Sequence, residues 1–335
     1  MIDFGAEKVV ALVVEKKDGA YRILGGGESE AQGIVCGQVR HIGDAVESLV
    51  EALRKAERSS GVRASTLYFN WDDPDMQSAH VTGSKSLTGE GQIDAADVAE
   101  ARQAAERLVG DFEKSIAYSR ETGFLIDGRD KVLNPVGVFG QKLDVNLHVL
   151  LSRAARGDVW KKLFQRAQVS KAVPVLTAWS VAWGVLPPAE RSRRRLIMDL
   201  GRDYLNAFVY ENDGIRDYAL WTADDKSTVE EIAAAAVSLA GRLLEKNTGV
   251  EQVLVTGDLA HNEPCVAEIR RQIKTPLLPA APAGVEKLEQ PRFASLAGLV
   301  AVAEELEKRV PLLDREKGML KDVKEKVTDF LNEYF

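Results

Sequence analysis

The sequence has little cysteine, no long hydrophobic run and no excess of basic residues. Only two cysteines, Cys36 and Cys265, occur among 335 residues, so neither a disulfide framework nor a cysteine metal site is predicted, and a reducing cytoplasm fits best. The formal net charge is −7, which argues against the basic surface that nucleic-acid binding requires. No apolar run reaches the roughly 18 residues of a membrane-spanning helix, and the first residues lack the pattern of a signal peptide.

Histidine is scarce as well, and its spacing does not suggest a metal site. The four histidines are His41, His80, His148 and His261. No two of them share a helical face at ligand spacing, so we interpret them as structural or surface residues. Apolar residues make up 45% and charged residues 28% of the chain, which is ordinary for a globular protein with two or three domains.

The pattern around which the chain is organised is a strand, an Asp-x-Gly turn and a second strand, in residues 195–210. Asp199 and Gly201 lie in that turn. Such a turn can present backbone N–H groups and a carboxylate to an anion, although a plain β-hairpin is the simpler explanation of one copy alone. A second copy in residues 1–14, with Asp3 and Gly5, predicts a duplicated, two-lobed α/β fold with a cleft between the lobes.

Other segments follow from hydrophobic periodicity and turn chemistry. We predict the glycine run Gly25 to Gly27 to be a flexible turn. Asp94 is the predicted N-cap of a helix in a separate block, residues 84–164. The other predicted helices are 42–58, 160–169, 174–186, 228–246, 264–273 and 295–310, and the stretch 276–282 is a predicted loop.

With these segments placed, the chain resembles FtsA, the actin-like membrane tether of bacterial cell division. Residues 3–8 stand where that family has Asp-Ile-Gly-Thr-Ser-Lys, and residues 29–39 resemble its Ser-x-Gly-Ile-x-x-Gly-x-Ile segment. The most specific match is 133–144 with His148, which is similar to Asp-Pro-Ile-Gly-Met-x-Gly-x-Arg-Leu-Glu in the domain inserted in FtsA. Residues 255–260 and 291–299 resemble the adenosine-side Leu-Thr-Gly-Gly-x-Ala and the returning Pro-x-Tyr-Ala-Thr-Ala-x-Gly-Leu helix.

The resemblance implies an actin-like two-lobed α/β fold of the actin, Hsp70 and hexokinase superfamily, with an FtsA-type inserted domain. It assigns residues 1–83 and 165–193 to the first lobe and residues 84–164 to the inserted domain. Residues 194–310 form a reduced second lobe, whose helix 295–310 returns to the first lobe. Residues 311–335 form a linker and an amphipathic helix. The outer subdomain of the second lobe, which docks the tail of FtsZ in the family, is missing between the central hairpin and the 228–246 helix, so direct FtsZ binding is not implied.

The family's nucleotide site carries over to seven positions. They are Asp3, Gly5, Lys8, Asp199, Gly201, Thr256 and Gly257. This sequence departs from the family at each contact, because Glu7 replaces a hydroxyl residue, residues 202–205 replace Gly-Gly-Thr-Thr, and Asp258 replaces a glycine. Bulk and negative charge where phosphate would lie predict a vestigial site with weak or no binding of ATP and Mg, and so a non-enzymatic pseudo-ATPase without catalytic residues.

The tail carries the predicted membrane contact. Its apolar positions recur at the spacing of one helical face, and they include Leu320, Val323, Val327, Phe330, Leu331, Tyr334 and Phe335. A helix packed on the core or on another helix explains this stripe too, but FtsA chains end in a membrane-targeting helix. The expected location is therefore the inner face of the cell membrane, and the expected partners are lipid, division proteins such as FtsA itself or membrane-protein tails, and further copies of the chain, but not nucleic acid.

Two alternatives remain open. One is an active actin-like ATP-binding filament protein in which Asp3, Lys8, Asp199 and Gly201 still hold Mg-ATP. The other is an adaptor of a pilus or secretion system, similar to PilM or to the cytoplasmic part of GspL. Fold-level likeness allows all three functions.

Overall fold

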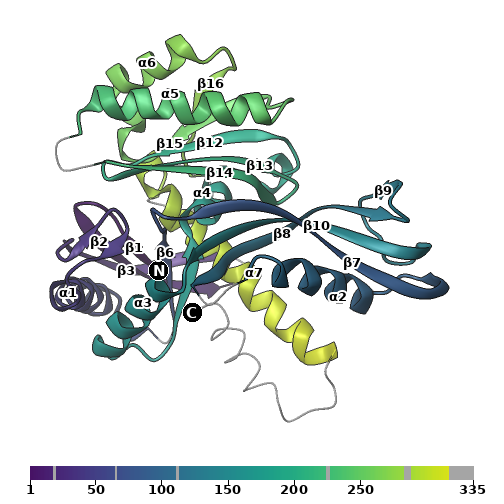
Figure 1. Ribbon diagram of the computed structural model, residues 1–335. Coiled ribbons are helices and arrows are strands. Elements are labelled where there is room, and N and C mark those ends of the chain that lie inside the picture. Colours follow the sequence, from purple (N-terminus) through teal and green to yellow (C-terminus); the bar gives the residue numbers. More distant parts are fainter. Residues whose placement is uncertain (18–19, 65, 111–112, 224–226, 283–287, 317–335) are drawn as a thin grey trace. The chain divides into compact units, whose positions relative to one another are not determined.

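The computed structural model describes residues 1–17, 20–64, 66–110, 113–223, 227–282 and 288–316 (Figure 1). The described chain divides into two compact units. The first comprises Met1–Pro74 and the residues from Arg156 onward, and the second is Asp75–Ala155. No helix within these described ranges is long and apolar enough to cross a membrane.

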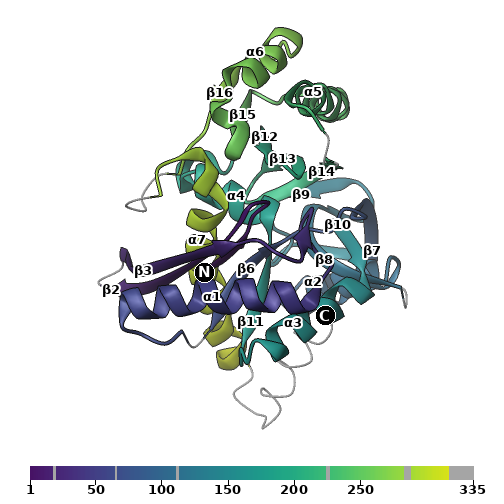
Figure 2. The ribbon, with the colours of Figure 1, turned by 90° about the vertical axis from the view of Figure 1, so that its left-hand side faces the viewer.

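The first unit contains a five-stranded sheet in the order β11-β6-β1-β2-β3. Its strands are β1 (Ile2–Phe4), β2 (Lys8–Lys17), β3 (Ala20–Glu30), β6 (Leu67–Trp71) and β11 (Ala172–Leu176). β1, β2 and β3 are antiparallel neighbours, whereas β6 pairs in parallel with both β1 and β11. Helix α1 (Ile42–Ser60) lies along this sheet (Figure 2), and the short hairpin β4 (Ile34–Val35) and β5 (Gln38–Val39) connects β3 to it.

The glycine run is a correction to the sequence prediction, because it lies within strand β3 and is not a turn. A Cβ atom on Gly27 would lie 2.3 Å from the carbonyl oxygen of Ala52, and one on Gly25 would lie 2.5 Å from the backbone nitrogen of Ser60. Both neighbours belong to α1. These glycines therefore let the helix backbone approach the strand more closely than any side chain would permit.

An aromatic cluster fixes helix α3 (Ala154–Arg166) to the first sheet. The rings of Phe69 and Phe164 are 4.6 Å apart and those of Phe4 and Trp160 are 4.8 Å apart, centroid to centroid. All four side chains are buried. Residues of α3 that were predicted to belong to the inserted domain thus form part of the core of the first unit.

A second five-stranded sheet of the first unit has the order β14-β13-β12-β15-β16. Its strands are β12 (Arg195–Leu200), β13 (Tyr204–Glu211), β14 (Gly214–Thr222), β15 (Gln252–Thr256) and β16 (Leu277–Pro279). The predicted central hairpin is confirmed as β12 and β13, paired from Arg195 with Tyr210 to Leu200 with Leu205. Helices α5 (Val229–Lys246) and α6 (Glu263–Gln272) cover one face of the sheet (Figure 1) and bury a common apolar cluster with it.

The prediction was incomplete in this region. Residues 218–222 belong to an edge strand, β14, that the sequence analysis did not predict, and β16 lies within the predicted 276–282 loop. Only residues 223–228 separate β14 from α5, which leaves no room for a further domain between them.

Helices α4 (Thr177–Val185) and α7 (Ala294–Glu316) pack against each other, and α4 contacts strands of both sheets. A Cβ on Gly298 would lie 1.6 Å from the carbonyl oxygen of Ser180, and one on Gly184 would lie 2.1 Å from that of Ala294. The two helices are therefore in backbone contact. The predicted 174–186 helix is corrected to a strand ending at Leu176 followed by α4, and α7 continues past the predicted end at residue 310.

The second unit is a separate four-stranded antiparallel sheet in the order β7-β10-β8-β9. Its strands are β7 (Gln77–Gln92), β8 (Lys114–Ile126), β9 (Asp130–Val132) and β10 (Phe139–Arg153). Helix α2 (Ala95–Arg107) covers one face and begins with the predicted N-cap, since Asp94 and Asp97 form a reciprocal capping box. Gly83 lets α2 approach β7, because a Cβ there would lie 2.0 Å from the oxygen of Ala101.

The observed bounds of this unit differ from the predicted 84–164. The unit begins at Asp75, because β7 already pairs with β10 from Gln77, and it ends at Ala155, because α3 packs on the first sheet. Its strands do not enter the sheet that contains β2, as expected for an inserted domain.

Candidate functional site

A cleft of about 420 Å³ lies within the first unit, between the turns that end its two sheets. Six of the seven predicted nucleotide-site residues line it: Asp3, Gly5, Lys8, Asp199, Gly201 and Gly257. Thr256 is the exception. Its buried hydroxyl donates a hydrogen bond to the carbonyl oxygen of Pro291 at 3.0 Å and so holds the start of the returning helix.

Tight turns shape the walls of the cleft. The β1–β2 turn is closed by the N–H of Gly5, which donates to the carbonyl oxygen of Lys8 at 3.0 Å. In the β12–β13 turn a Cβ on Gly201 would lie 2.6 Å from the oxygen of Tyr204. Gly257 has a φ of 90° and would place a Cβ 2.5 Å from Oδ1 of Asp199. Gly201 and Gly257 are therefore required by their own turns.

Two aspartates on the cleft wall, Asp3 and Asp199, have pKa values well above the ordinary range of aspartate. Asp3 accepts a short hydrogen bond from Asn70, whose Oδ1 in turn accepts from the N–H of Phe4 at 2.9 Å. Burial, and then the negative charge of Asp258, raise the pKa of Asp3 to about 7. Burial, and then the charges of Asp72, Asp258 and Asp3, raise the pKa of Asp199 to about 8.

We expect Asp199→Asn to stabilise the protein increasingly as the pH rises. The folded pKa of about 8 exceeds the ordinary value of 3.8, so the stability that the carboxyl contributes is fully present below pH 3.8 and is lost as the pH rises to about 8. A lone group would lose at most about 1.4 kcal/mol for each pH unit in that window. Melting temperatures of the natural chain and the variant between those pH values measure the effect, and a gain that is the same at both ends would contradict it.

Charged side chains of both signs gather at the mouth of the cleft. Arg202 forms an ion pair of 3.3 Å with Glu7, and both side chains are exposed. Burial raises the pKa of Asp258, Arg202 opposes this shift, and Glu7 and Asp203 add to it. The β1–β2 turn, the β12–β13 turn and the turn after β15 thus carry one carboxylate each, and a side-chain ion pair joins the first two turns.

A buried chain of hydrogen bonds joins the two sheets below the cleft. The hydroxyl of Tyr218 donates to Oδ1 of Asn206 at 2.6 Å, and Nδ2 of Asn206 donates to Oδ2 of Asp72 at 3.1 Å. The three side chains are at most 5% exposed. Burial raises the pKa of Asp72 to about 7, although the side chains of Thr177, Asn206 and Tyr204 act in the opposite direction.

Sequence patterns did not predict this chain of hydrogen bonds. Asp72 stands in a run of turn-forming residues after β6, and nothing in the local pattern distinguishes a buried aspartate from an exposed one. The one signal is Asn206, a polar residue between apolar neighbours in the middle of β13.

The β4–β5 hairpin also contacts the second sheet. Cys36 has a φ of 48°, and its N–H donates to Oδ2 of Asp203 at 3.4 Å. Its thiol lies 3.4 Å from the carbonyl oxygens of Asp203 and Ala223. Asp203, predicted to stand where phosphate would bind, is therefore in part held by the backbone of this hairpin.

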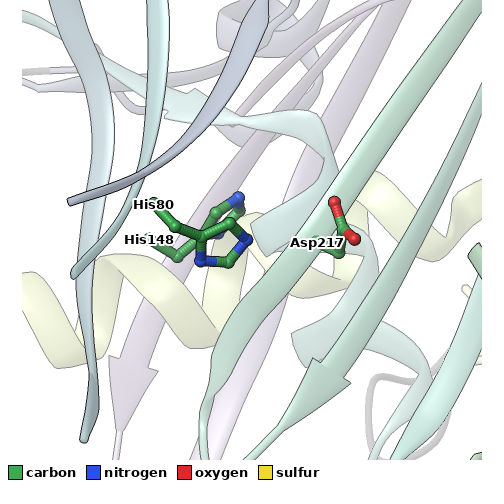
Figure 3. Close-up of side chains that lie close together, drawn as sticks. All are labelled: His80, His148 and Asp217. Carbon is green, nitrogen blue, oxygen red and sulfur yellow. The ribbon is translucent and has the colours of Figure 1, made fainter. Parts of the chain in front are cut away.

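In the second unit, His80 and His148 lie side by side on β7 and β10 (Figure 3), with ring centroids 4.9 Å apart. Nε2 of His148 is 2.8 Å from the hydroxyl of Ser78. Sequence spacing missed the pair because cross-strand neighbours are far apart in the chain. Asp217, also labelled in Figure 3, belongs to the first unit, where Lys246 and Asn247 bind its carboxylate at 2.9 and 3.1 Å.

The predicted membrane-binding residues, from Leu320 to Phe335, lie outside the described residues. They are left as predictions from the sequence.

Comparisons with known proteins bear on both units. Residues 74–151 match the family described as the SHS2 domain inserted in FTSA. Cell division protein FtsA of Pseudomonas aeruginosa is 23% identical over 235 residues, which cover 70% of this chain and 56% of the relative. FtsA of Rhizobium meliloti is 26% identical over 213 residues, which cover 60% and 48%. The chain spans about half the length of the curated relatives it matches.

Solved structures extend the likeness to nearly the whole chain. A chain of a PilM–PilN type IV pilus biogenesis complex superposes with a TM-score of 0.64 at 14% identity, covering 90% of this chain and 97% of that one. MreB 5 of Spiroplasma citri, bound to AMPPNP, gives a TM-score of 0.51 at 8% identity, covering 92% and 97%. At such identities the likeness concerns the fold, which is the predicted actin-like α/β fold.

Proposed function

The chain is FtsA-like, an actin-like body that carries an SHS2 domain of the FtsA type, and from this premise we propose that it is a non-enzymatic scaffold of bacterial cell division. It acts on the inner face of the cell membrane, where its C-terminal segment contacts lipid and its SHS2 unit contacts division proteins. The observation that carries the proposal is the charge of the cleft, in which the three turns that would hold a nucleotide bear Glu7, Asp203 and Asp258.

The lining of the cleft fits a nucleoside triphosphate poorly. Three carboxylates would repel the phosphate charges, and the guanidinium of Arg202 is already 3.3 Å from Glu7. Phosphate binding needs a stretch of backbone that phosphate oxygens can approach closely, which side chains obstruct. In the β12–β13 turn, Gly201 offers such backbone at one residue, and Arg202 follows it at once. Asp3 and Asp199 offer carboxylate oxygens that suit Mg²⁺, but they would hold the metal without the phosphate oxygens that normally complete its coordination.

We expect the natural chain to bind Mg-ATP more weakly than a dissociation constant of about 1 mM. At an effective dielectric constant near 20, a carboxylate about 4 Å from a phosphate charge costs on the order of 4 kcal/mol before screening. Two such contacts offset a micromolar affinity, which is worth about 8 kcal/mol. Isothermal titration calorimetry measures this directly.

The control is a variant with Glu7→Ser, Asp203→Gly and Asp258→Gly, which removes all three charges. If those charges are what weakens nucleotide binding, this variant binds Mg-ATP at least tenfold more tightly than the natural chain. Micromolar or tighter binding by the natural chain would contradict the proposed loss of the nucleotide site and favour the ATP-binding filament protein.

The second expected result concerns the segment after α7. The full chain should co-sediment with anionic vesicles, whereas a chain ending at Glu316, which retains all of α7, should not. Burial of six or seven apolar side chains of the segment would contribute roughly 1.5 kcal/mol or more each, offset in part by the ordering of the helix.

Phe330→Glu is the point variant for this experiment, and it should reduce the pelleted fraction severalfold. Asn332→Glu, which adds the same charge outside the predicted apolar stripe, serves as its control. Equal sedimentation of the truncated and full chains would remove the membrane tether from the proposal.

The extent of the structural likeness favours one other candidate, an adaptor similar to PilM. The superposition with the pilus complex covers 97% of that chain, whereas this chain spans about half of each FtsA relative. Co-expression with a PilN homologue, or with FtsA, from the same genome distinguishes the two roles. Stable co-purification with the PilN homologue alone would favour the adaptor.

A further inference from the structure

A second, smaller cavity lies in the first unit, where the β4–β5 hairpin, the end of β6 and helix α3 meet. Its volume is about 20 Å³. Gln38, Asp72 and Arg156 are the polar residues that line it, beside the apolar side chains of Val159 and Trp160. Asp72 is also the residue that receives the hydrogen bond from Asn206 of the second sheet.

Two buried oxygen atoms of this lining accept no hydrogen bond from the described residues. They are Oε1 of Gln38 and Oδ1 of Asp72, on side chains that are 4% and 3% exposed. Thr177 and Tyr204 lie near enough to lower the pKa of Asp72, but neither makes a hydrogen bond to Oδ1. Buried acceptors are costly to leave without a donor, so a donor is to be expected between them.

Size and charge define what that donor is. When Asp72 is ionised both oxygens are acceptors, so the occupant must donate twice, and 20 Å³ accommodates a single water molecule, which needs about 10–15 Å³ on this measure. Arg156 also lines the cavity and brings a positive charge, which disfavours a potassium or ammonium ion. A water molecule satisfies both requirements.

We propose that this cavity binds one internal water molecule, which donates one hydrogen bond to Oε1 of Gln38 and the other to Oδ1 of Asp72. The water completes a continuous polar relay from the β4–β5 hairpin through Asp72 and Asn206 to Tyr218 of the second sheet. Groups of the chain itself and one water thus join the two sheets below the cleft. If the cleft binds no nucleotide, as the proposed function has it, this relay takes the place of a nucleotide as the link between the two sheets. The water site itself does not depend on the proposed function.

A high-resolution crystal structure of the full chain tests the water site. We expect one isolated density peak within hydrogen-bond distance, roughly 2.7–3.2 Å, of both oxygens. Three results would overturn the proposal: a cavity without density, a direct contact between the Gln38 and Asp72 oxygens, or an ion revealed by anomalous scattering after a rubidium soak. Tight binding of Mg-ATP, or failure of lipid binding, would contradict the proposed function but would leave this result untouched.

Solution measurements provide a second test. Gln38→Leu removes one acceptor and displaces the water while filling the cavity, so the melting temperature should fall by several degrees. Gln165→Leu, the same substitution at an exposed site on α3, should leave it unchanged. The melting temperature of the natural chain should be the same in sodium, potassium and ammonium chloride of equal concentration. If the Gln38→Leu variant had the melting temperature of the natural chain, or if one cation specifically stabilised the natural chain, the proposed water site would be contradicted.

Discussion

Gly298→Ala is expected to lower the melting temperature by roughly 6–12 °C. The added methyl group would lie 1.6 Å from the carbonyl oxygen of Ser180, which belongs to the backbone of α4 and cannot rotate away. Helices α4 and α7 must then separate, which costs about 3 kcal/mol, and each kcal/mol corresponds to roughly 2–4 °C in a unit of this size. Because α4 contacts both sheets, the disturbance reaches the cleft as well.

Gly241→Ala is the matched control for this substitution. Gly241 lies inside helix α5, and a Cβ there would meet nothing within 4 Å. Alanine at that position should stabilise the protein by about 0.5–1 kcal/mol, because glycine loses more conformational freedom in a helix. Scanning calorimetry of both variants gives the comparison, and a Gly298→Ala protein as stable as the natural one would show that α4 and α7 are not in backbone contact.

Asn206→Leu is expected to destabilise the protein by about 3 kcal/mol at pH 8, because it removes the donor to Asp72 while that carboxyl remains buried. The pKa of Asp72 should then rise beyond about 7, since one of the groups that lower it is lost. A raised folded pKa costs stability as the pH increases toward that pKa, so the loss should be smaller at pH 5. Urea unfolding at the two pH values measures it.

Tyr218→Phe distinguishes the stability contributions of the two hydrogen bonds that the Asn206 side chain makes. It removes only the 2.6 Å bond to Oδ1 of Asn206 and should cost about 1 kcal/mol with little change between pH 5 and pH 8. The double variant should lose less stability than the two single losses combined, because both substitutions break the same bond. Strict additivity would be evidence against a continuous chain of hydrogen bonds.

The sequence by itself determined the elements that neighbouring residues in the chain are enough to specify. The two Asp-x-Gly hairpins at Asp3 and Asp199 combine apolar runs with turn residues, which specify paired strands and the cleft-lining positions between them. The capping box at Asp94 likewise needs only three neighbouring residues to start α2. The charges near the cleft were also readable, because Glu7 and Asp203 stand in these turns and Asp258 directly follows Gly257 in the chain.

Only the tertiary structure decided which segments meet. The glycines of β3 resemble a turn until α1 is placed against them, and the end of the inserted unit depends on Trp160 packing against Phe4. Asp72 and Asn206 are 134 positions apart, so no local pattern could predict their hydrogen bond. Hydrophobic period and turn chemistry act over a few residues, whereas close backbone approach and burial of a polar group depend on partners that the fold brings together from distant parts of the chain.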